Sequence, residues 1–590
     1  MVSYRLLYPS LGSSLFAAPA LNHEAAGVHP QWPSVPSFPG AGGLPETAAA
    51  SAEGLCGGRF EFLNLPARDL GRPVRWTGIE GADPLWEYCL HCGEWALSLA
   101  AAYRITAEAR FGEALVRLLG DWVENNPPGS RPGWEPYPIS RRLVAWGRVA
   151  ITMGRDAGWE ELWERRLAPS MWRQARFLEA NLEKDLANNH LMGNFRALAW
   201  VGLLFPRWPR ARRWLEMGLG GLWAEMRRQV LSDGVHDERG ISYHTMVLQD
   251  LLETWQLCRL TGQAVPEDVP HTLMRMLQFL ADMQAPDGSY PMLNDTVPGY
   301  PMDPRGLLLA GSTLLGQSRW VALAAGGDRR YATWLTGTAP QSMYDPRGGD
   351  HGPTLAVYPE AGYVIFRKEN RESLWFDGGP MGPEHLPGHG HADALSLAWF
   401  AGGRWLLVDP GVFGYFAPGP RDRLRSTASH NTVSVDGRDQ CVFWGPFRVA
   451  YPPKVRLLGW SKDEAAGEHY GYARLGEPVV HRRSVRRLGP GAWEIHDRFE
   501  GRGRHEFLFA LQLAPGAVAQ AEEAGCEALW PEGARLRIHC AGPPAGARPA
   551  VEPGCVSLGW NLEEVAPRFV LRWRSQVPCE SRARLELMAG

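Results

Sequence analysis

Histidine and carboxylate side chains are concentrated in one stretch of the chain, residues 386–437. This stretch contains His389, His391 and His430 together with Asp409. Residues two apart on an extended strand point to the same face, so an extended His-Gly-His places His389 and His391 over one space. Two imidazoles and a carboxylate are a common ligand set for zinc. The sequence therefore predicts that His391, Asp409 and His430 bind one divalent metal ion, with zinc expected. The alternative is three unrelated polar residues hydrogen-bonded to backbone at strand ends.

A β-hairpin is expected to position these groups. Residues 395–400 have the pattern of a strand, residues 401–404 that of a tight turn, and residues 405–408 that of the returning strand. Asp409 then follows the second strand, where its side chain can re-enter the site. Asp393 is either a group that orients a metal-binding imidazole or a simple turn cap.

The composition of the whole chain limits the function classes. The 590 residues are too many for one ordinary domain, and 45% hydrophobic with 21% charged residues is typical of a soluble globular protein. A net charge of -3 gives no general attraction to nucleic acid or anionic membrane, so local arginines must bind any anionic substrate. No apolar run reaches about 18 residues, so no membrane span is expected. Nine scattered cysteines argue against a disulfide framework.

The apolar periodicity divides the chain into three parts. Residues 1–82 are rich in Pro, Gly and Ala and are predicted to form an irregular arm, with short strands around 58–65 and 71–77. Residues 83–340 carry apolar residues at helical spacing in about nine segments, which indicates paired helices in an incomplete (α/α) toroid. Residues 341–590 change to a period of two, typical of an antiparallel β-sandwich. The predicted fold class is α+β multidomain, helices first and strands after.

Polar residues gather in four further loops, each next to a predicted helix or strand. Each loop alone can be explained by helix capping and turn chemistry. Their density, combined with the histidine-rich hairpin, favours a functional site. The four loops are residues 134–142, 184–190, 233–244 and 287–295.

Seven segments within residues 83–445 occur in the order of one known family. They are WEPYPISRRLVAW, NNHLMGNFRAL, DGVHDERGISYH, DGSYPMLND, GHGHADALS, LLVDPG and RSTASHNTVSVDG. In these segments the chain resembles the heparinase II/III-like polysaccharide lyases, relatives of one group of alginate lyases. The resemblance implies an (α/α) toroid followed by a β-sandwich. It also implies β-elimination on a uronic-acid-containing polysaccharide that is glycosaminoglycan-like, alginate-like or a bacterial exopolysaccharide.

The resemblance implies a role for four residues in the elimination. The reaction removes the C5 proton next to a carboxylate, so negative charge develops there and must be neutralised. Asn189, with His190 beside it, matches the family's charge-neutralising position. Tyr243 matches the proton shuttle, although free tyrosine has a pKa of about 10 and needs help to act as a base. His389 matches the second acid/base group.

Further positions follow from the same resemblance and from their residue types. His391, Asp409 and His430 match metal ligands whose ion is chiefly structural. Arginines can bind carboxylate or sulfate through paired contacts, or can form salt bridges within the protein. Tryptophans in the matching loops, Trp86, Trp134 and Trp444, could stack on a sugar face. The predicted substrate-binding residues are Tyr137, Arg141, Glu238, Trp134, Tyr415 and Arg425.

Two other functions are compatible with the residues. An inverting glycoside hydrolase would use two carboxylates about 6.5–9.5 Å apart, with Asp233, Glu238 and Asp295 as candidates. A non-catalytic glycan-binding or exopolysaccharide-assembly protein would not need a Tyr–His proton pair. A product assay separates lyase from hydrolase, because only the lyase leaves an unsaturated uronate that absorbs in the near ultraviolet.

The expected partner is an acidic polysaccharide or oligosaccharide. Neither nucleic-acid binding nor membrane insertion is expected, and a homodimer is compatible with the sequence. Residues 1–24 make a poor signal peptide, which indicates a cytoplasmic protein. The family resemblance instead implies a periplasmic or secreted one.

Overall fold

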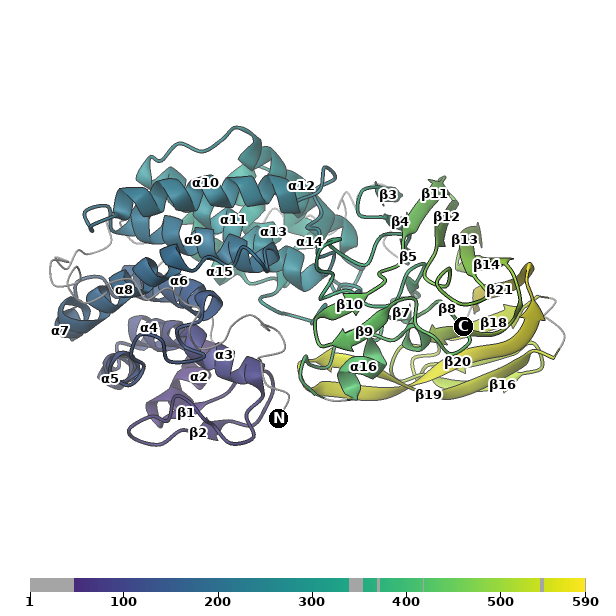
Figure 1. Ribbon diagram of the computed structural model, residues 1–590, viewed down its shortest axis with the longest axis horizontal. Coiled ribbons are helices and arrows are strands. Elements are labelled where there is room, and N and C mark those ends of the chain that lie inside the picture. Colours follow the sequence, from purple (N-terminus) through teal and green to yellow (C-terminus); the bar gives the residue numbers. More distant parts are fainter. Residues whose placement is uncertain are drawn as a thin grey trace. The chain divides into compact units, whose positions relative to one another are not determined.

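Helices precede antiparallel strands along the chain, as predicted (Figure 1). The computed structural model describes residues 47–156, 158–338, 354–368, 372–417, 419–541 and 546–588. The first 46 residues of the predicted arm lie outside the described residues. Among the described helices, none combines the length and apolar character needed to cross a membrane.

Helices occupy the chain from residue 47 to residue 336, and every predicted helical segment has a helix at its place. Their bounds are α2 (Thr47–Cys56), α3 (Pro84–Cys92), α4 (Trp95–Thr106), α5 (Ala109–Asn125), α6 (Pro136–Met153), α7 (Glu160–Leu162), the π-helix η2 (Trp163–Leu167), α8 (Ala168–Ala180), α9 (Asn188–Leu204), α10 (Ala211–Gln229), α11 (Ile241–Thr261), α12 (Asp268–Met283), α13 (Pro304–Leu315), α14 (Arg319–Leu323) and α15 (Arg329–Thr336). Sequentially neighbouring helices pack in pairs, such as α9 on α10 and α4 on α5.

The apolar periodicity predicts one continuous helix over residues 88–103, whereas the structure has two helices, α3 and α4, across this stretch. Asp83 caps α3 by accepting a hydrogen bond from the Leu85 amide at 2.7 Å, and Pro84 occupies the first helical position. Gly93 ends α3 with a φ of 70°, a conformation that favours glycine. A Cβ at Gly93 would also lie 2.9 Å from Nε1 of Trp146. The break is therefore fixed by both backbone conformation and close packing.

The predicted strands of the N-terminal arm are mostly irregular chain in the structure. In the described part of the arm, from residue 47 onward, the strands are limited to the short pair β1 (Arg59–Phe60) and β2 (Arg68–Asp69). Residues 71–77, predicted as a strand, contain no strand. Hydrophobic residues of this arm pack on one another and on the helices, as when Phe60 contacts the ring of Trp76 in the arm and the ring of Trp95 in α4.

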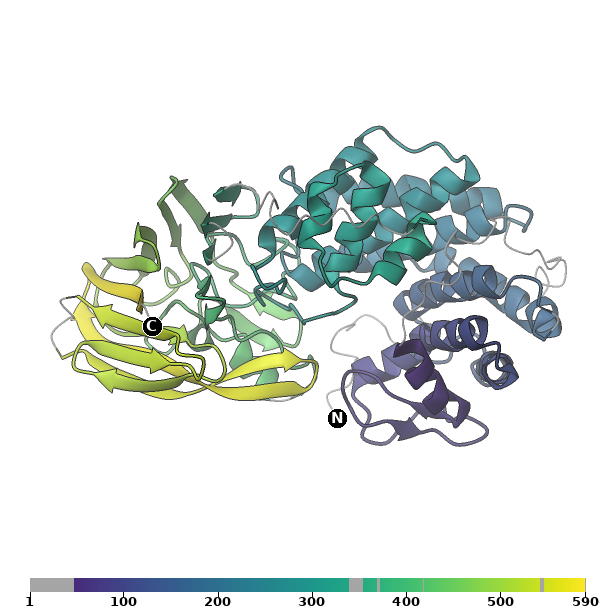
Figure 2. The same ribbon diagram turned by 180° about the vertical axis from the view of Figure 1, so that it is seen from behind.

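The strand region contains three larger sheets among the described residues, and all their neighbouring strands are antiparallel. The strand orders are β3-β4-β5-β6-β7, β11-β12-β13-β14-β21-β18-β17-β16 and β19-β20-β15-β8. The long strands β19 and β20 run side by side (Figures 1 and 2). The predicted hairpin is present as β6 and β7. The bounds are β3 (Leu355–Tyr358), β4 (Tyr363–Lys368), β5 (Glu372–Asp377), β6 (Leu397–Ala401), β7 (Arg404–Leu407), β8 (Val433–Val435), β9 (Val442–Gly445), β10 (Arg448–Ala450), β11 (Val455–Trp460), β12 (Glu464–His469), β13 (Val479–Gly489), β14 (Ala492–Gly501), β15 (Arg504–Gln512), β16 (Val518–Glu522), β17 (Gly525–Leu529), β18 (Arg535–Cys540), β19 (Arg548–Gly559), β20 (Leu562–Gln576) and β21 (Cys579–Met588).

The three sheets bury their apolar faces in one continuous core. Trp399 from the five-stranded sheet, Trp493 from the eight-stranded sheet and Phe507 from the four-stranded sheet all belong to it. Buried and less buried residues alternate along β13 and β14, as expected when one face of a sheet is covered. This arrangement is a β-sandwich.

Two compact units are interleaved along the chain. One comprises residues up to Gln229 with Met246–Leu277 and the helices from Asp303 onward. The other joins Val230–Thr245 and Gln278–Met302 to the strand region. The start of α11 and the loop after α12 therefore belong to the same unit as the histidine-rich hairpin. The sequence-based division at residues 82 and 340 stays a prediction.

A buried polar chain crosses β12, β13 and β14; it consists of His469, His481, Asp497 and Arg483. The Gly471 amide donates to Nδ1 of His469 at 3.2 Å, so His469 carries its proton on Nε2 and donates to Nδ1 of His481 at 3.1 Å. His481 then donates from Nε2 to Oδ1 of Asp497 at 2.7 Å. Burial lowers the pKa of both histidines, which keeps them neutral.

Arg483 connects this buried polar chain to the histidine-rich segments. It donates to Asp497 from Nε at 2.7 Å and from Nη2 at 3.0 Å. Its Nη1 donates to the carbonyl oxygens of Leu395 at 2.9 Å and Asn431 at 2.6 Å. Asn431 directly follows His430 in the sequence. One buried guanidinium thus links two segments that carry candidate metal ligands.

Candidate functional site

The candidate site lies in the second unit, where two loops around α11 and α12 meet the segments that flank β6 and β7. The Asp295 amide donates to the carbonyl oxygen of His389 at 3.1 Å. Next to it, the side-chain oxygen of Asn294 accepts from the His391 amide at 3.1 Å. Hydrogen bonds between the same loop and the start of α11, such as Val297 N–H to Ser242 Oγ at 2.8 Å, fix Tyr243 beside it. Residues far apart in sequence are thereby held in one site.

Tyr243, His389 and Tyr415 form an aromatic group at this point. The rings of Tyr243 and His389 stack with centroids 3.9 Å apart and planes 29° apart. The hydroxyl groups of Tyr243 and Tyr415 are hydrogen-bonded to each other. Burial, together with Tyr415 and Asp295, raises the pKa of Tyr243 well above its ordinary value. The resting phenol therefore holds its proton.

Asp295 is the central carboxylate of the site. Its Oδ2 bonds Nδ1 of His389 at 2.9 Å and its Oδ1 bonds Nε2 of His391 at 3.0 Å. Arg421, from α16 (Pro420–Leu424), pairs with both oxygens. Burial alone would raise the pKa of Asp295, but Arg421 and the two histidines hold it well below its ordinary value. The ionised Asp295 accepts a hydrogen bond from one N–H of each imidazole, so in the neutral rings the lone pairs lie on Nε2 of His389 and Nδ1 of His391.

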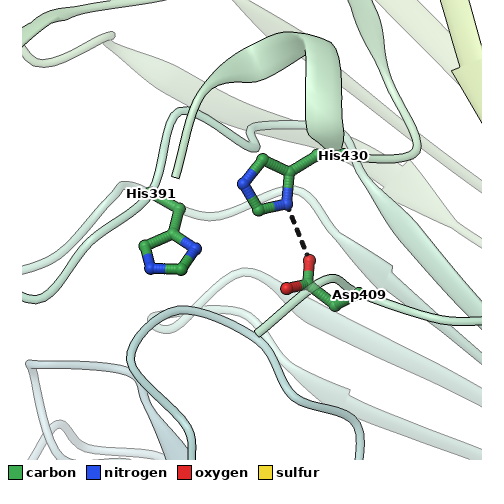
Figure 3. Close-up of side chains that lie close together, drawn as sticks. All are labelled: His391, Asp409 and His430. Atoms are coloured by element: carbon green, nitrogen blue, oxygen red, sulfur yellow. Dashed lines mark hydrogen bonds and ion pairs between the residues drawn. The ribbon is translucent and has the colours of Figure 1, made fainter. Parts of the chain in front are cut away.

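His391, Asp409 and His430 converge in the structure (Figure 3). One potential ligand atom from each lies within 4.8 Å of the others. His430 bonds Oδ2 of Asp409 through Nδ1 at 2.9 Å. Nδ1 of His391 and Nε2 of His430 are buried and have no hydrogen-bond partner among the described residues. Two lone-pair nitrogens beside a carboxylate fit the donor set that zinc prefers, so these residues could hold such an ion.

Asp393 lies in the same buried environment. Burial raises its pKa, and the nearby His430 partly opposes the shift. Glu238 is also buried, with Oε2 3.7 Å from Nε2 of His389. Asp233 instead holds the turn at residues 360–361, because its Oδ2 accepts hydrogen bonds from the amides of Glu360 and Ala361, each at 3.0 Å.

Asn189 and His190 belong to the first unit, at the start of α9. Both are preceded by Ala187 and Asn188 in left-handed conformations, with φ of 52° and 46°. Nδ1 of His190 bonds Oε1 of Glu183 at 3.0 Å. The predicted substrate residue Tyr137 lies beside it, since its ring stacks on His190 with centroids 4.2 Å apart.

Three predicted substrate contacts have partners within the protein. Trp134 is only 2% exposed and donates from Nε1 to the carbonyl oxygen of Asn126 at 2.9 Å, and its role in substrate binding stays a prediction. Arg425 is buried and donates to two main-chain carbonyl groups, and its role in binding substrate likewise stays a prediction. Arg141 pairs with Glu94 at 2.6 Å, and its substrate role stays a prediction.

Sequence reasoning did not identify the partnership of Asp295 with His389 and Arg421. The sequence suggests Asp295 only as a hydrolase carboxylate and assigns no individual role to Arg421. The available signal was the Asn-Asp pair that ends one matching segment, at residues 294–295. It is separated from His389 by more than 90 residues, so only the folded chain brings the two together.

Comparisons with known proteins cover most of the chain. Residues 46–302 match the family model described as "Heparinase II/III N-terminus", and residues 350–579 match "Heparinase II/III-like, C-terminal". A heparin-sulfate lyase of Bacteroides thetaiotaomicron is 25% identical over 467 residues, covering 73% of this chain and 61% of the relative. A heparin-sulfate lyase of Pedobacter heparinus is 21% identical over 394 residues, covering 63% and 55%. The chain thus spans about 60% of the length of these curated relatives.

Solved structures share the fold. A crystal structure of heparinase III has a TM-score of 0.76 at 16% identity, with 99% of this chain and 88% of the other covered. A crystal structure of the heparan sulfate lyase HepC from Pedobacter heparinus has a TM-score of 0.61 at 19% identity, covering 94% and 86%. At these identities the likeness shows the arrangement of helices and strands alone.

Proposed function

Because the chain belongs to the heparinase II/III-like family, we propose that it is a polysaccharide lyase that cleaves a uronic-acid-containing glycosaminoglycan by β-elimination. The names of the relatives, heparin-sulfate lyases, support a glycosaminoglycan over alginate or a bacterial exopolysaccharide. The observation that carries the proposal is the stacked pair of Tyr243 and His389, with Asp295 bonded to the imidazole.

The reaction requires two proton transfers and no net oxidation. The C5–H and C4–O4 bonds break, a C4–C5 double bond forms, and the uronate carboxylate carries the developing negative charge. A base takes the C5 proton, and an acid gives a proton to the leaving O4. Two acid/base groups and a means of neutralising charge are therefore sufficient.

His389 and Tyr243 have the properties that these transfers need. Because Nδ1–H of His389 donates to the ionised Asp295, the ring is held in the tautomer whose Nε2 carries a lone pair. The buried phenol of Tyr243 retains a proton that it can deliver to an oxygen. We propose Tyr243 as proton shuttle and His389 as the second acid/base group.

Asn189 and His190 are proposed, from the family resemblance, to neutralise the substrate carboxylate. An amide N–H₂ group can donate to the developing charge without adding a proton acceptor. Replacing Asn189 with Ala is expected to lower kcat with little change in KM, because the contact strengthens only in the transition state. Steady-state kinetics test this role.

The hydrolase alternative is less compatible with the carboxylates. A general acid must hold a proton near neutral pH, whereas Arg421 and two histidines keep Asp295 ionised. Asp233 is engaged with main-chain amides. These contacts leave Glu238 as the remaining candidate of that set.

The product assay tests the proposed activity. The purified protein is incubated with heparan sulfate, hyaluronan, chondroitin sulfate and alginate while near-ultraviolet absorbance is followed. We expect absorbance to rise with a glycosaminoglycan and the Tyr243→Phe variant to abolish the rise. Tyr472→Phe is the matched control, because Tyr472 is also buried and donates its hydroxyl proton, but to the carbonyl oxygen of Val433. New reducing ends without absorbance would contradict the proposal.

We also propose one divalent ion, zinc, held by His391, Asp409 and His430 in a structural role. When bound, the ion would join three chain segments by coordinate bonds and supply no proton transfer. Elemental analysis should find about one ion per chain, and His430→Ala should remove it. His505→Ala is a suitable control, since that buried histidine is also paired with a carboxylate, Asp436, at 2.7 Å. Metal content that is unchanged in His430→Ala would exclude this site.

The remaining proposals concern assembly and compartment. A homodimer is tested by light scattering of the purified protein. Periplasmic or secreted location, implied by the resemblance, is tested by fractionating cells that produce the full chain.

A further inference from the structure

A hairpin formed by β9 and β10 ends at the candidate site. Its tip, residues 445–447, is held by Arg425, which donates to the carbonyl oxygens of Gly445 and Pro446 at 3.0 Å each. Phe447 at the tip lies edge-on to His389, with ring centroids 5.3 Å apart. It also contacts the Tyr415 ring at 4.9 Å. The hairpin is therefore continuous with the aromatic group proposed to act on the substrate.

The two faces of this hairpin differ. Phe443 and Val449 pack inward, against a small cluster that includes Met381 and Ala392, and the Arg425 guanidinium lies 4.0 Å over the Phe443 ring. Because side chains alternate along a strand, the neighbours of Phe443 point outward. Val442 is 41% exposed and Trp444 is 63% exposed. The hairpin thus has one packed face and one open aromatic face.

An exposed tryptophan beside an arginine has a specific binding chemistry. The Arg448 guanidinium lies 5.9 Å from the centre of the Trp444 ring. An indole can cover the apolar face of a pyranose ring, and a guanidinium can pair with a carboxylate or sulfate. The other tryptophans considered for sugar stacking, Trp86 and Trp134, are buried. Of the three, Trp444 alone offers its ring to solvent.

We infer that the outward face of the β9–β10 hairpin is an outer subsite for an acidic polysaccharide, with Trp444 as the stacking surface and Arg448 as the anion contact. The inference rests on the proposed lyase function. Sugar units bound here would flank the unit processed at His389 and Tyr243, because the hairpin tip contacts His389. Longer chains would gain affinity from this face and short ones would not.

Kinetics with substrates of two lengths test the subsite. Trp444→Ala should raise KM for heparan sulfate polymer about 3- to 10-fold, the value expected for loss of one aromatic contact, with kcat unchanged. KM for a heparan sulfate tetrasaccharide should stay within twofold. Trp444→Phe should restore most of the polymer affinity. Trp460→Ala is the control: Trp460 is 47% exposed and ends β11, which Figure 1 shows well apart from β9.

A binding measurement separates this inference from the proposed function. Mobility in gels that contain heparan sulfate is compared for Tyr243→Phe and for Tyr243→Phe combined with Trp444→Ala. Weaker retention of the double variant supports the subsite even if no lyase activity is found with any polymer. Equal retention and equal polymer KM would refute the subsite while leaving the lyase proposal intact.

Three other outcomes would also overturn the inference. An equal rise in KM for polymer and tetrasaccharide would mean that Trp444→Ala disturbs the site itself. A molecular mass of Trp444→Ala that differs from that of the wild type by light scattering would assign the face to contact with a second copy of the chain. If Trp444→Ala no longer bound anionic phospholipid vesicles while its retention by polysaccharide was unchanged, the face would be assigned to contact with a membrane surface.

Discussion

Replacing Asp497 with Asn is expected to destabilise the β-sandwich strongly. Asp497 accepts hydrogen bonds from Nε and Nη2 of Arg483 and from Nε2 of His481. All three side chains are buried. An amide in place of the carboxylate removes the negative charge and presents N–H donors to other donors. Breaking a buried ion pair in this way costs about 3–5 kcal/mol, because the Arg483 charge is left without compensation.

The same two strands provide a matched control. Arg486 on β13 pairs with Glu494 on β14 at 2.7 Å, but their side chains are 51% and 23% exposed. Solvent screens such a pair, so Glu494→Gln should cost about 0–1 kcal/mol. Both changes convert a carboxylate to its amide opposite an arginine, and they differ mainly in burial.

Thermal unfolding monitored by calorimetry measures the difference. Asp497→Asn should lower Tm by roughly 6–10 °C, given about 2 °C per kcal/mol in a large domain. Burial alone would raise the pKa of Asp497, but Arg483 and His481 hold it well below its ordinary value. The stabilisation by ionised Asp497 is therefore complete above the unfolded pKa of about 3.9 and is lost as pH falls below that value. The Tm values of the wild type and of Asp497→Asn should accordingly converge in acid. A Tm loss no larger than that of Glu494→Gln would refute the reasoning.

Three further predictions concern other parts of the chain. A Cβ at Gly218 would collide with the backbone of α9, so Gly218→Ala should lower the free energy of unfolding by about 1–3 kcal/mol. Gly220 has open space around it, so Gly220→Ala should be neutral or stabilising. A lower Tm for Gly220→Ala than for Gly218→Ala would contradict this. Burial would raise the pKa of Glu179, but hydrogen bonds from Arg210 and its neighbours lower it to about 2. The wild type should therefore be more stable than Glu179→Gln by its full margin above pH 4.5, and this margin should decline toward pH 2. Tm values of both proteins measured against pH would show it. A chelator should lower the Tm of the wild type and leave that of His430→Ala unchanged, and an equal decrease in both would exclude a structural ion at this site.

The fold class and the family were predicted from the sequence, and both are confirmed. Helical periodicity located the helices because their apolar faces are long and regular. The β6–β7 hairpin was predicted because its Ala-Gly-Gly turn separates two apolar runs. The local sequence pattern was sufficient to predict an element wherever that element has its own apolar periodicity or turn residues.

Contacts between distant segments were not predictable in the same way. His469 and His481 lie on neighbouring strands, and only the strand register brings them opposite each other. Trp134 was assigned to substrate because its loop is polar, although its ring packs on Phe177 with centroids 5.5 Å apart. Residue type and spacing do not reveal whether a side chain points inward. His391, Asp409 and His430 do converge, whereas their binding of a metal ion stays a prediction.

Asp295 makes two sets of residues energetically dependent on each other. One carboxylate bonds His389, proposed for proton transfer, and His391, proposed for metal binding. A charge change on either imidazole alters the carboxylate that the other contacts. Substitutions of His389 and His391 should therefore have non-additive effects on stability. A variant that already lacks one of these histidines should lose less stability when the other is removed. Over evolutionary time the two histidines would be retained or lost together, as one inherited trait.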